Sequence, residues 1–252
     1  MQVYVYDNYE ALSIAAAKIV AEALKQNPAL KLGFSTGSTP LGLYAELVRL
    51  HKSEGLSFSK AFGFNLDEYL GLPACDEQSY HFFMQEQLYR HIDIPPENSF
   101  IPDATAKDPT AEAARYEGLI SAHGGIDLQI LGVGTNGHIG FNEPGSPWDS
   151  PCRVADLAYD TLVANARFFD NDMEKVPKQA ITMGIATILA AKRIIFMASG
   201  QAKAEIIGKI LKGEQTLNIP ATALQNHPDV ALLLDKAAAL DVLLPNRSRP
   251  PM

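Results

Sequence analysis

The amino-acid sequence predicts an α/β protein built on an open, mostly parallel sheet with helices on both faces. Apolar runs typical of strands alternate with segments of helical spacing, and repeated alternation of this kind is typical of parallel sheets. Of the 252 residues, 47% are hydrophobic and 20% are charged, which excludes a disordered chain. We expect a single domain over residues 1–252, because a chain of this length can bury a substantial core.

In the first half of the chain, helical and strand-like segments follow each other closely. Residues 11–24 carry apolar side chains at near-helical spacing after the capping pair Asp7-Asn8. Thr39 is a good N-cap, and Pro40 suits the first position of a helix. The other elements expected here are a strand over residues 30–34, the helix through residues 41–48, a strand over 61–66, and helices over 79–90 and 110–122.

The second half continues the alternation after an irregular stretch. Its apolar runs predict strands, and a long apolar run after Pro177 predicts a buried helix. We expect the Arg-Pro end of the chain to be frayed. The expected elements are a strand over residues 128–133, the buried helix over 180–191, a strand over 193–198, a helix over 201–211 and a strand over 230–234.

Charge and composition exclude several classes of function. A formal net charge of −8 argues against nucleic acid as a partner. The N-terminus has no basic region before an apolar core, and no apolar stretch approaches the roughly eighteen residues needed to span a membrane. We therefore expect a cytoplasmic protein with no membrane partner. Cys75 and Cys152 lie far apart without a neighbouring cysteine, so two free thiols are expected.

The most informative segment is 127–144, DLQILGVGTNGHIGFNEP. An apolar strand runs into glycines and delivers His138 and Glu143, a candidate proton-transfer pair, where α/β proteins place their chemistry. Residues 132–137 also match GxGxxG, which binds a dinucleotide when a helix follows at once. Residues 138–151 have three prolines and no helical period, so the dinucleotide interpretation is disfavoured.

A candidate anion-binding loop follows the strand over residues 30–34. Its hydroxyls and glycine lead into a helix N-terminus, whose free amides and positive dipole end can hold a phosphate. It is not a Walker A loop, because no lysine follows the glycine. The alternative is a polar cap and turn. The loop residues are Ser35, Thr36, Gly37, Ser38 and Thr39.

Adjacent carboxylates follow the strand over residues 61–66. Asp67 at such a strand end can act as a base, since partial burial raises its pKa toward useful values. The alternative is a helix cap or a solvated turn. Of the two acidic residues, we expect Glu68 to be the structural one.

Two cations complete the candidate site. They are Arg167, in the run NARFF, and Lys203, which is expected in the first turn of the helix over residues 201–211. The helix dipole disfavours a cation there, unless an anion binds at the same place and accepts charge-assisted hydrogen bonds. A solvated lysine is the alternative.

Taken together, the motifs FNLDEY, GVGTNGHIGFNEP, NARFF and GQAKA resemble those of the glucosamine-6-phosphate deaminase family over nearly the whole chain. The resemblance implies a Rossmann-like fold of the sugar-phosphate isomerase type, which 6-phosphogluconolactonases share. It also implies a reaction without metal or organic cofactor, in which glucosamine 6-phosphate and water give fructose 6-phosphate and ammonia. The alternatives are a lactonase of this fold and a sugar-phosphate sensor, although no DNA-binding helices precede residue 30.

The resemblance assigns a role to each candidate residue. Asp67 corresponds to the general base that moves the proton between C2 and C1, and His138 to the ring-opening acid/base with Glu143 as its carboxylate partner. Many members carry an aspartate where this chain has Asn136. An amide supplies no negative charge, so we expect Glu143 to be the main electrostatic partner of His138. The Ser35–Thr39 loop, Arg167 and Lys203 are expected to hold the substrate phosphate.

The allosteric, hexameric members use an additional basic site. Arg153 lies in the matching region of this chain, but Ala155 stands where a basic residue is expected. By resemblance to the shorter members, we expect a monomer with hyperbolic kinetics and no activation by N-acetylglucosamine 6-phosphate.

Overall fold

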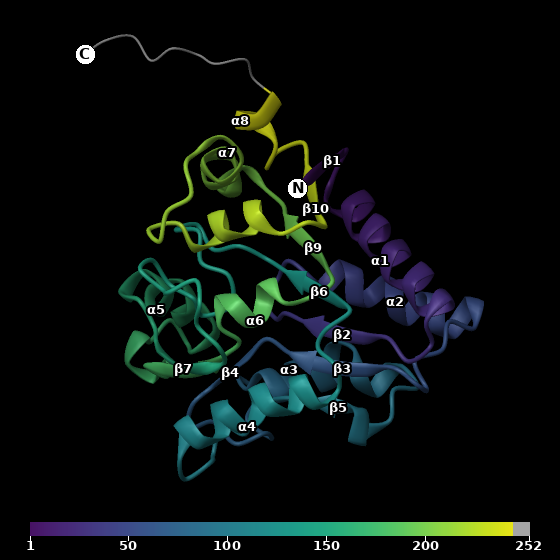
Figure 1. Cartoon of the computed structure of the whole chain (residues 1–252), viewed down its shortest axis with the longest axis vertical. Helices are drawn as coiled ribbons and strands as arrows, with labels where there is room; N and C mark the ends of the chain where they lie inside the picture. The colour runs from purple at the N-terminus through teal and green to yellow at the C-terminus, as the bar shows by residue number, and fades with distance from the viewer. Residues whose placement is uncertain (244–252) are drawn as a thin grey trace.

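The structure, a computed structural model, describes residues 1–243. Its centre is a seven-stranded sheet with strand order β1-β10-β9-β6-β2-β3-β5, in which all neighbouring strands are parallel (Figure 1). The predicted open, mostly parallel sheet is therefore confirmed. Its strands are β1 (Gln2–Tyr6), β2 (Lys31–Phe34), β3 (Phe62–Asn65), β5 (Ser99–Phe100), β6 (Leu128–Leu131), β9 (Arg193–Ala198) and β10 (Val230–Asp235).

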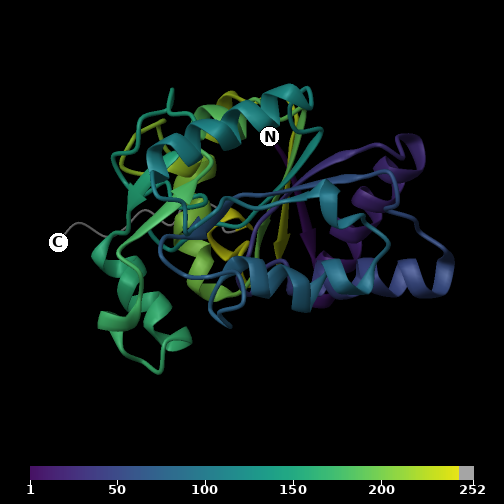
Figure 2. The ribbon, with the colours of Figure 1, turned by 90° about the horizontal axis from the view of Figure 1, so that it is seen from below.

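Helices cover both faces of this sheet, as predicted. The helices of residues 1–243 are α1 (Tyr9–Gln26), α2 (Leu41–Glu54), α3 (Tyr80–Gln87), α4 (Pro109–Ala122), α5 (Tyr159–Asn165), α6 (Ile185–Leu189), α7 (Ala204–Lys212) and α8 (Leu240–Leu243). Of these, α5 packs in a separate hydrophobic cluster that contains no residue of this sheet. Successive side chains of a strand point to opposite faces. In β9, Ile195 and Met197 pack with α1, α2 and α3, whereas Ile194 and Phe196 pack with α4, α6 and α7. Figure 2 shows the two layers of helices with the sheet between them.

A second, antiparallel sheet with strand order β4-β8-β7 was not predicted by the sequence. It consists of β4 (Asp67–Tyr69), β7 (Arg153–Asp156) and β8 (Gln179–Thr182). The predicted helix over residues 180–191 is therefore wrong, because its first residues form β8 and its helical part is α6 alone. Ala180 and Ile181 are fully buried, and a short apolar run has the same pattern in a buried strand as in a buried helix.

Of the other local predictions, one helix cap is confirmed and several details differ from the structure. The Asn8 side chain accepts a hydrogen bond from Ala11 N, which confirms the predicted cap of α1. Thr39 does not cap α2, because Pro40 occupies the N-cap position and no side chain caps the helix. The edge strands β1 and β5 were not predicted, and the irregular stretch after residue 138 contains β7 and α5. The frayed end predicted at Arg249-Pro250 lies outside the described residues.

Cys75 is exposed and Cys152 is buried, and both are free thiols as predicted. No helix within residues 1–243 has the length and apolar character required to cross a membrane.

Candidate active site

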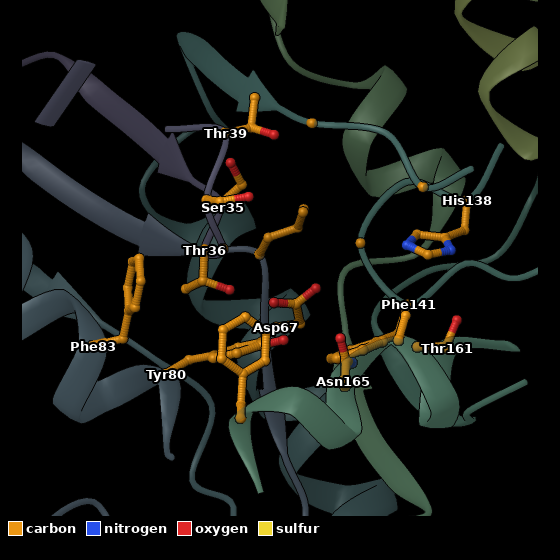
Figure 3. A pocket seen from close by; sticks show the side chains of 18 of the residues that line it. Ser35, Thr36, Thr39, Asp67, Tyr80, Phe83, His138, Phe141, Thr161 and Asn165 are labelled. Carbon is orange, nitrogen blue, oxygen red and sulfur yellow. The ribbon is translucent and has the colours of Figure 1, made fainter. Parts of the chain in front are cut away.

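The carboxyl ends of β2, β3, β6 and β9 open onto one cavity of about 590 Å³. Polar loops follow these strands at the same edge of the parallel sheet, where such folds bind ligands. Figure 3 shows Ser35, Thr36, Thr39, Asp67 and His138 around this cavity. The predicted site residues that line it are Ser35, Thr36, Gly37, Ser38, Thr39, Asp67, Asn136, His138, Arg167 and Lys203.

The glycine-rich loop after β6 turns back on itself and no helix follows it directly. Gly134 N donates to His138 O at 2.9 Å, and Gly137 N donates to Gly134 O at 3.0 Å. Gly137 has a φ of +88°, which favours glycine. A Cβ at Gly134 would lie 2.2 Å from the His138 imidazole. The glycine therefore leaves room for the imidazole, and the absence of a following helix agrees with the rejection of a dinucleotide site.

Glu143 lies behind His138 instead of lining the cavity. Its Oε2 atom is 3.5 Å from His138 Nδ1 and accepts a 2.9 Å hydrogen bond from Asn136 Nδ2. The other oxygen, Oε1, accepts a hydrogen bond from the Thr161 hydroxyl. The Asn136 Oδ1 atom also accepts from His138 N at 3.1 Å. Asn136 thus bridges the backbone of His138 and the carboxylate, and an ionised aspartate in its place would have no hydrogen to donate to Glu143.

These contacts control the charge of Glu143. Burial favours the protonated form, but the nearby His138 imidazole, followed by the hydrogen bonds from Thr161 and Asn136, outweighs it and holds the pKa of Glu143 at about 2. Glu143 is therefore a carboxylate at neutral pH, able to orient the imidazole and to stabilise its protonated form.

Asp67 is the first residue of β4 and is 5% exposed. Burial, followed by the neighbouring carboxyl group of Glu68, raises the pKa of Asp67 well above its ordinary value. A carboxyl group in such an environment holds a proton more strongly and is a stronger base when ionised.

Glu68 points into the structure and not into the cavity. It accepts hydrogen bonds of 2.8 to 2.9 Å from the N–H groups of Tyr69, Tyr80 and His81. Burial dominates over these bonds and raises the pKa of Glu68 to about 7. The carboxylate holds the N-terminus of α3 against β4, which agrees with the structural role predicted for it.

The loop over residues 35–39 is fixed by two tyrosines. Tyr44 OH donates to Ser35 O at 2.5 Å. Tyr9 OH lies 3.0 Å from Ser38 O and 2.9 Å from Thr39 O, and accepts a 2.8 Å hydrogen bond from Gly42 N. These contacts hold the loop against α1 and α2, and the loop lines the cavity at the N-terminus of α2, where free amides and the positive end of the helix dipole favour an anion.

Arg167 and Lys203 bring positive charge to this side of the cavity. Lys203 forms the last residue of a 3-10 turn, and α7 begins at Ala204. Burial, followed by repulsion from Arg167, lowers the pKa of Lys203. Within residues 1–243 neither cation forms an ion pair, and Arg167 stacks on the Phe168 ring at 4.6 Å. Two neighbouring cations without a carboxylate partner favour an anionic ligand.

The sequence did not single out several residues that hold the site together. Thr161 and Tyr9 contact site residues from distant parts of the chain, and an isolated threonine or tyrosine carries no signal of such a contact. Tyr69 and Asn165 fall inside the recognised motifs, and Asn165 Nδ2 donates to Tyr69 OH at 2.7 Å. In the described part of the chain no group of three His, Cys, Asp or Glu residues could hold a metal ion.

The comparisons with known proteins agree with this geometry. The family of glucosamine-6-phosphate isomerases and 6-phosphogluconolactonases matches residues 7–232, and the chain belongs to this family. Among its relatives, the glucosamine-6-phosphate deaminase of Bacillus velezensis is 50% identical over 239 residues, which cover 95% of this chain and 99% of that protein. Glucosamine-6-phosphate deaminase 1 of Bacillus subtilis is 48% identical, with coverage of 95% and 98%.

Solved structures show the same relationship. One described as a monomeric glucosamine-6-phosphate deaminase has a TM-score of 0.94 and 48% identity, and covers 95% of this chain and 99% of its own. The 6-phosphogluconolactonase from Trypanosoma cruzi has a TM-score of 0.79 at 22% identity, with coverage of 96% and 97%. The lactonase shares the fold.

Proposed function

We propose that this chain is a glucosamine-6-phosphate deaminase, which converts glucosamine 6-phosphate and water to fructose 6-phosphate and ammonia. The observation that carries the proposal is the combination of side chains at one cavity. The buried carboxyl group of Asp67 and the imidazole of His138, backed by Glu143, share this cavity with Arg167 and Lys203, two cations without carboxylate partners. Relatives at 48 to 50% identity that carry the deaminase name support the same activity.

In the proposed mechanism, His138 transfers the proton that opens the sugar ring. Glu143 orients the imidazole and stabilises its protonated form. Asp67 then takes the proton from C2 and returns it to C1, as the C1 oxygen gains a proton and the C2 amine loses one. This step converts the amine-bearing carbon to an imine, and water releases ammonia from it to leave the 2-ketose. A positioned base contributes about 10²- to 10⁴-fold to such proton transfers.

The remaining groups bind the phosphate. The Ser35–Thr39 loop offers hydroxyls and backbone amides at the N-terminus of α2, and Arg167 and Lys203 add charge-assisted hydrogen bonds. A dianionic substrate would relieve the repulsion between the two cations.

We further propose that the chain is a hydrolytic enzyme of amino-sugar catabolism and acts in N-acetylglucosamine utilisation. We also propose that it is cytoplasmic and monomeric, and that residues 1–252 form one domain. The similarity to a deaminase described as monomeric supports the oligomeric state. Ala155 in place of a basic residue beside Arg153 supports hyperbolic kinetics without activation by N-acetylglucosamine 6-phosphate. Initial rates measured with and without this compound test the proposal, and a sigmoidal curve that the compound makes hyperbolic would contradict it.

The activity itself is tested by ammonia release from glucosamine 6-phosphate, with hydrolysis of 6-phosphogluconolactone as the control reaction. We expect ammonia release and no lactone hydrolysis above the uncatalysed rate. Lactone hydrolysis without deamination would refute the proposal in favour of a lactonase, and binding without either reaction would favour a sensor.

A further inference from the structure

One short helical segment contacts three different parts of the candidate site. It consists of α5 and the 3-10 turn Ala166–Phe168 that continues it directly, since Ala166 N still donates to Leu162 O. Thr161, Asn165 and Arg167 all belong to this segment. A continuous helical backbone fixes the spacing of its side chains, so these three groups are positioned together.

The contacts of the segment reach the carboxylate partner of His138, the strand that carries Asp67, and the cation side of the cavity. The Thr161 hydroxyl donates to Glu143 Oε1. Asn165 Nδ2 donates to Tyr69 OH at 2.7 Å, two residues beyond Asp67 in β4. Arg167 lines the cavity beside Lys203. The bond from Thr161 links the segment directly to the carboxylate behind His138.

Thr161 has the properties required to fix the orientation of that carboxylate. Its side chain is buried, with 4% of the residue exposed. The terminal torsion of a glutamate is soft and is set by its hydrogen bonds. With Oε1 held by Thr161, Oε2 faces Asn136 Nδ2 and His138 Nδ1. Without the hydroxyl, Oε1 loses its hydrogen bond, and the contacts of Oε2 alone are left to set the plane of the carboxylate.

We propose that Thr161 is a positioning residue, which fixes the Glu143 carboxylate against His138 and attaches it to the same helical segment as Arg167. The kinetic part of this inference rests on the proposed deaminase function, whereas the hydrogen-bond part does not. A substrate phosphate bound by Arg167 would then stabilise the same segment that orients the acid/base pair.

The groups that face Glu143 determine how its pKa changes when the Thr161 hydroxyl is removed. The titratable group that faces it is His138, and Asn136 and Thr161, which also face it, are uncharged. Asp160, next to Thr161, lines the cavity. Loss of the threonine hydroxyl removes one hydrogen bond to the charged form of Glu143 and leaves burial in place, so its pKa must rise.

The test compares Thr161→Val with Thr161→Ser, which keeps the hydroxyl, and with a matched control, Thr187→Val. Thr187 is also 4% exposed, and its hydroxyl donates to a carboxylate, Glu117 Oε2, at 2.7 Å, but it lies outside the cavity lining. The measurements on the full chain are kcat and KM for glucosamine 6-phosphate, the thermal midpoint, and the titration of Glu143 by side-chain carboxyl NMR, assigned with Glu143→Gln.

We expect Thr161→Val to lower kcat by about two- to tenfold with little change in KM, because a hydrogen bond to the carboxylate is lost while its charge stays beside the imidazole. The pKa of Glu143 should rise from about 2 to roughly 3–4. Thr161→Ser should restore both values, and Thr187→Val should lower the thermal midpoint without changing kcat or this pKa.

Two results would overturn the inference: an unchanged titration of Glu143 in Thr161→Val, or a loss of kcat in Thr161→Ser as large as in the valine variant. If the valine variant does not fold, the serine variant and Thr161→Ala are compared in its place. If the unmodified protein releases no ammonia, the proposed function fails, and the carboxyl titration still decides the role of Thr161.

Discussion

Replacing Glu143 with Gln should slow the proposed reaction far more than replacing Asn136 with Ala. The first change removes a negative charge 3.5 Å from His138 Nδ1. At an effective dielectric constant of 20, two unit charges at that distance interact by about 5 kcal/mol. His138 is 25% exposed, so solvent screens part of this energy, and charge-assisted hydrogen bonds measure about 1.5–3 kcal/mol. The expected loss of kcat is therefore roughly 10- to 150-fold.

Asn136→Ala leaves the charge of Glu143 and its bond to Thr161 in place. It removes the bond from Asn136 Nδ2 to Glu143 and the bond from His138 N to Asn136 Oδ1. Because the imidazole keeps its carboxylate, we expect a loss of kcat of less than about tenfold. The assay is the rate of ammonia release at saturating glucosamine 6-phosphate, with thermal unfolding to confirm that each variant is folded.

Glu117→Gln is the matched control for the carboxylate. Glu117 Oε2 accepts hydrogen bonds from Cys152 N and from the Thr187 hydroxyl, yet Glu117 does not line the cavity. The Glu117→Gln variant should leave kcat unchanged. Equal losses in Glu143→Gln and Asn136→Ala, or a larger loss in the alanine variant, would refute the reasoning that the charge of Glu143 is the dominant influence on His138.

Two further predictions follow from burial and close packing at the site. Asp67→Asn should reduce kcat by about 10²- to 10⁴-fold, yet raise the thermal midpoint at pH 8 more than at pH 5. The raised pKa of Asp67 means that the folded state loses stability as pH rises above the ordinary carboxyl pKa, and the amide removes this loss. If Asp67→Asn were less stable than the unmodified protein at pH 8, this prediction would be wrong. Gly134→Ala should displace the His138 imidazole, since the added Cβ would lie 2.2 Å from it, and should lower kcat at least tenfold. A crystal structure with the imidazole in place, or an unchanged kcat, would contradict this second prediction.

The sequence predicted the parts of the fold whose local pattern is unambiguous. Residues 193–198 and 230–234 are short apolar runs between polar boundaries, and they form β9 and most of β10. Residues 180–191 are also apolar, but the pairing of β8 with β4 and β7 decides their structure. That pairing is a tertiary contact, which periodicity does not encode.

A similar limit applies to the site. The motifs predicted that His138, Asp67 and the loop over residues 35–39 lie together, and they line one cavity because parallel strands end at one edge of the sheet. The contacts of Thr161 with Glu143 and of Tyr9 with the loop over residues 35–39 join residues 18 and about 30 positions apart. They depend on how α5 and α1 pack, so the residue types alone do not reveal them.

The position of β1 has a consequence for how the protein is made. Residues 2–6 pair with residues 231–235 of β10, at the edge of the large sheet. At 5–20 residues per second, a ribosome delivers the partner strand roughly 10–50 s after β1. During synthesis β1 must wait without its neighbour, and its side chains Val3, Tyr4 and Val5 remain about 40% exposed even in the finished fold. β1 is thus made early and paired late, and until β10 arrives its unpaired edges and apolar side chains are open to aggregation.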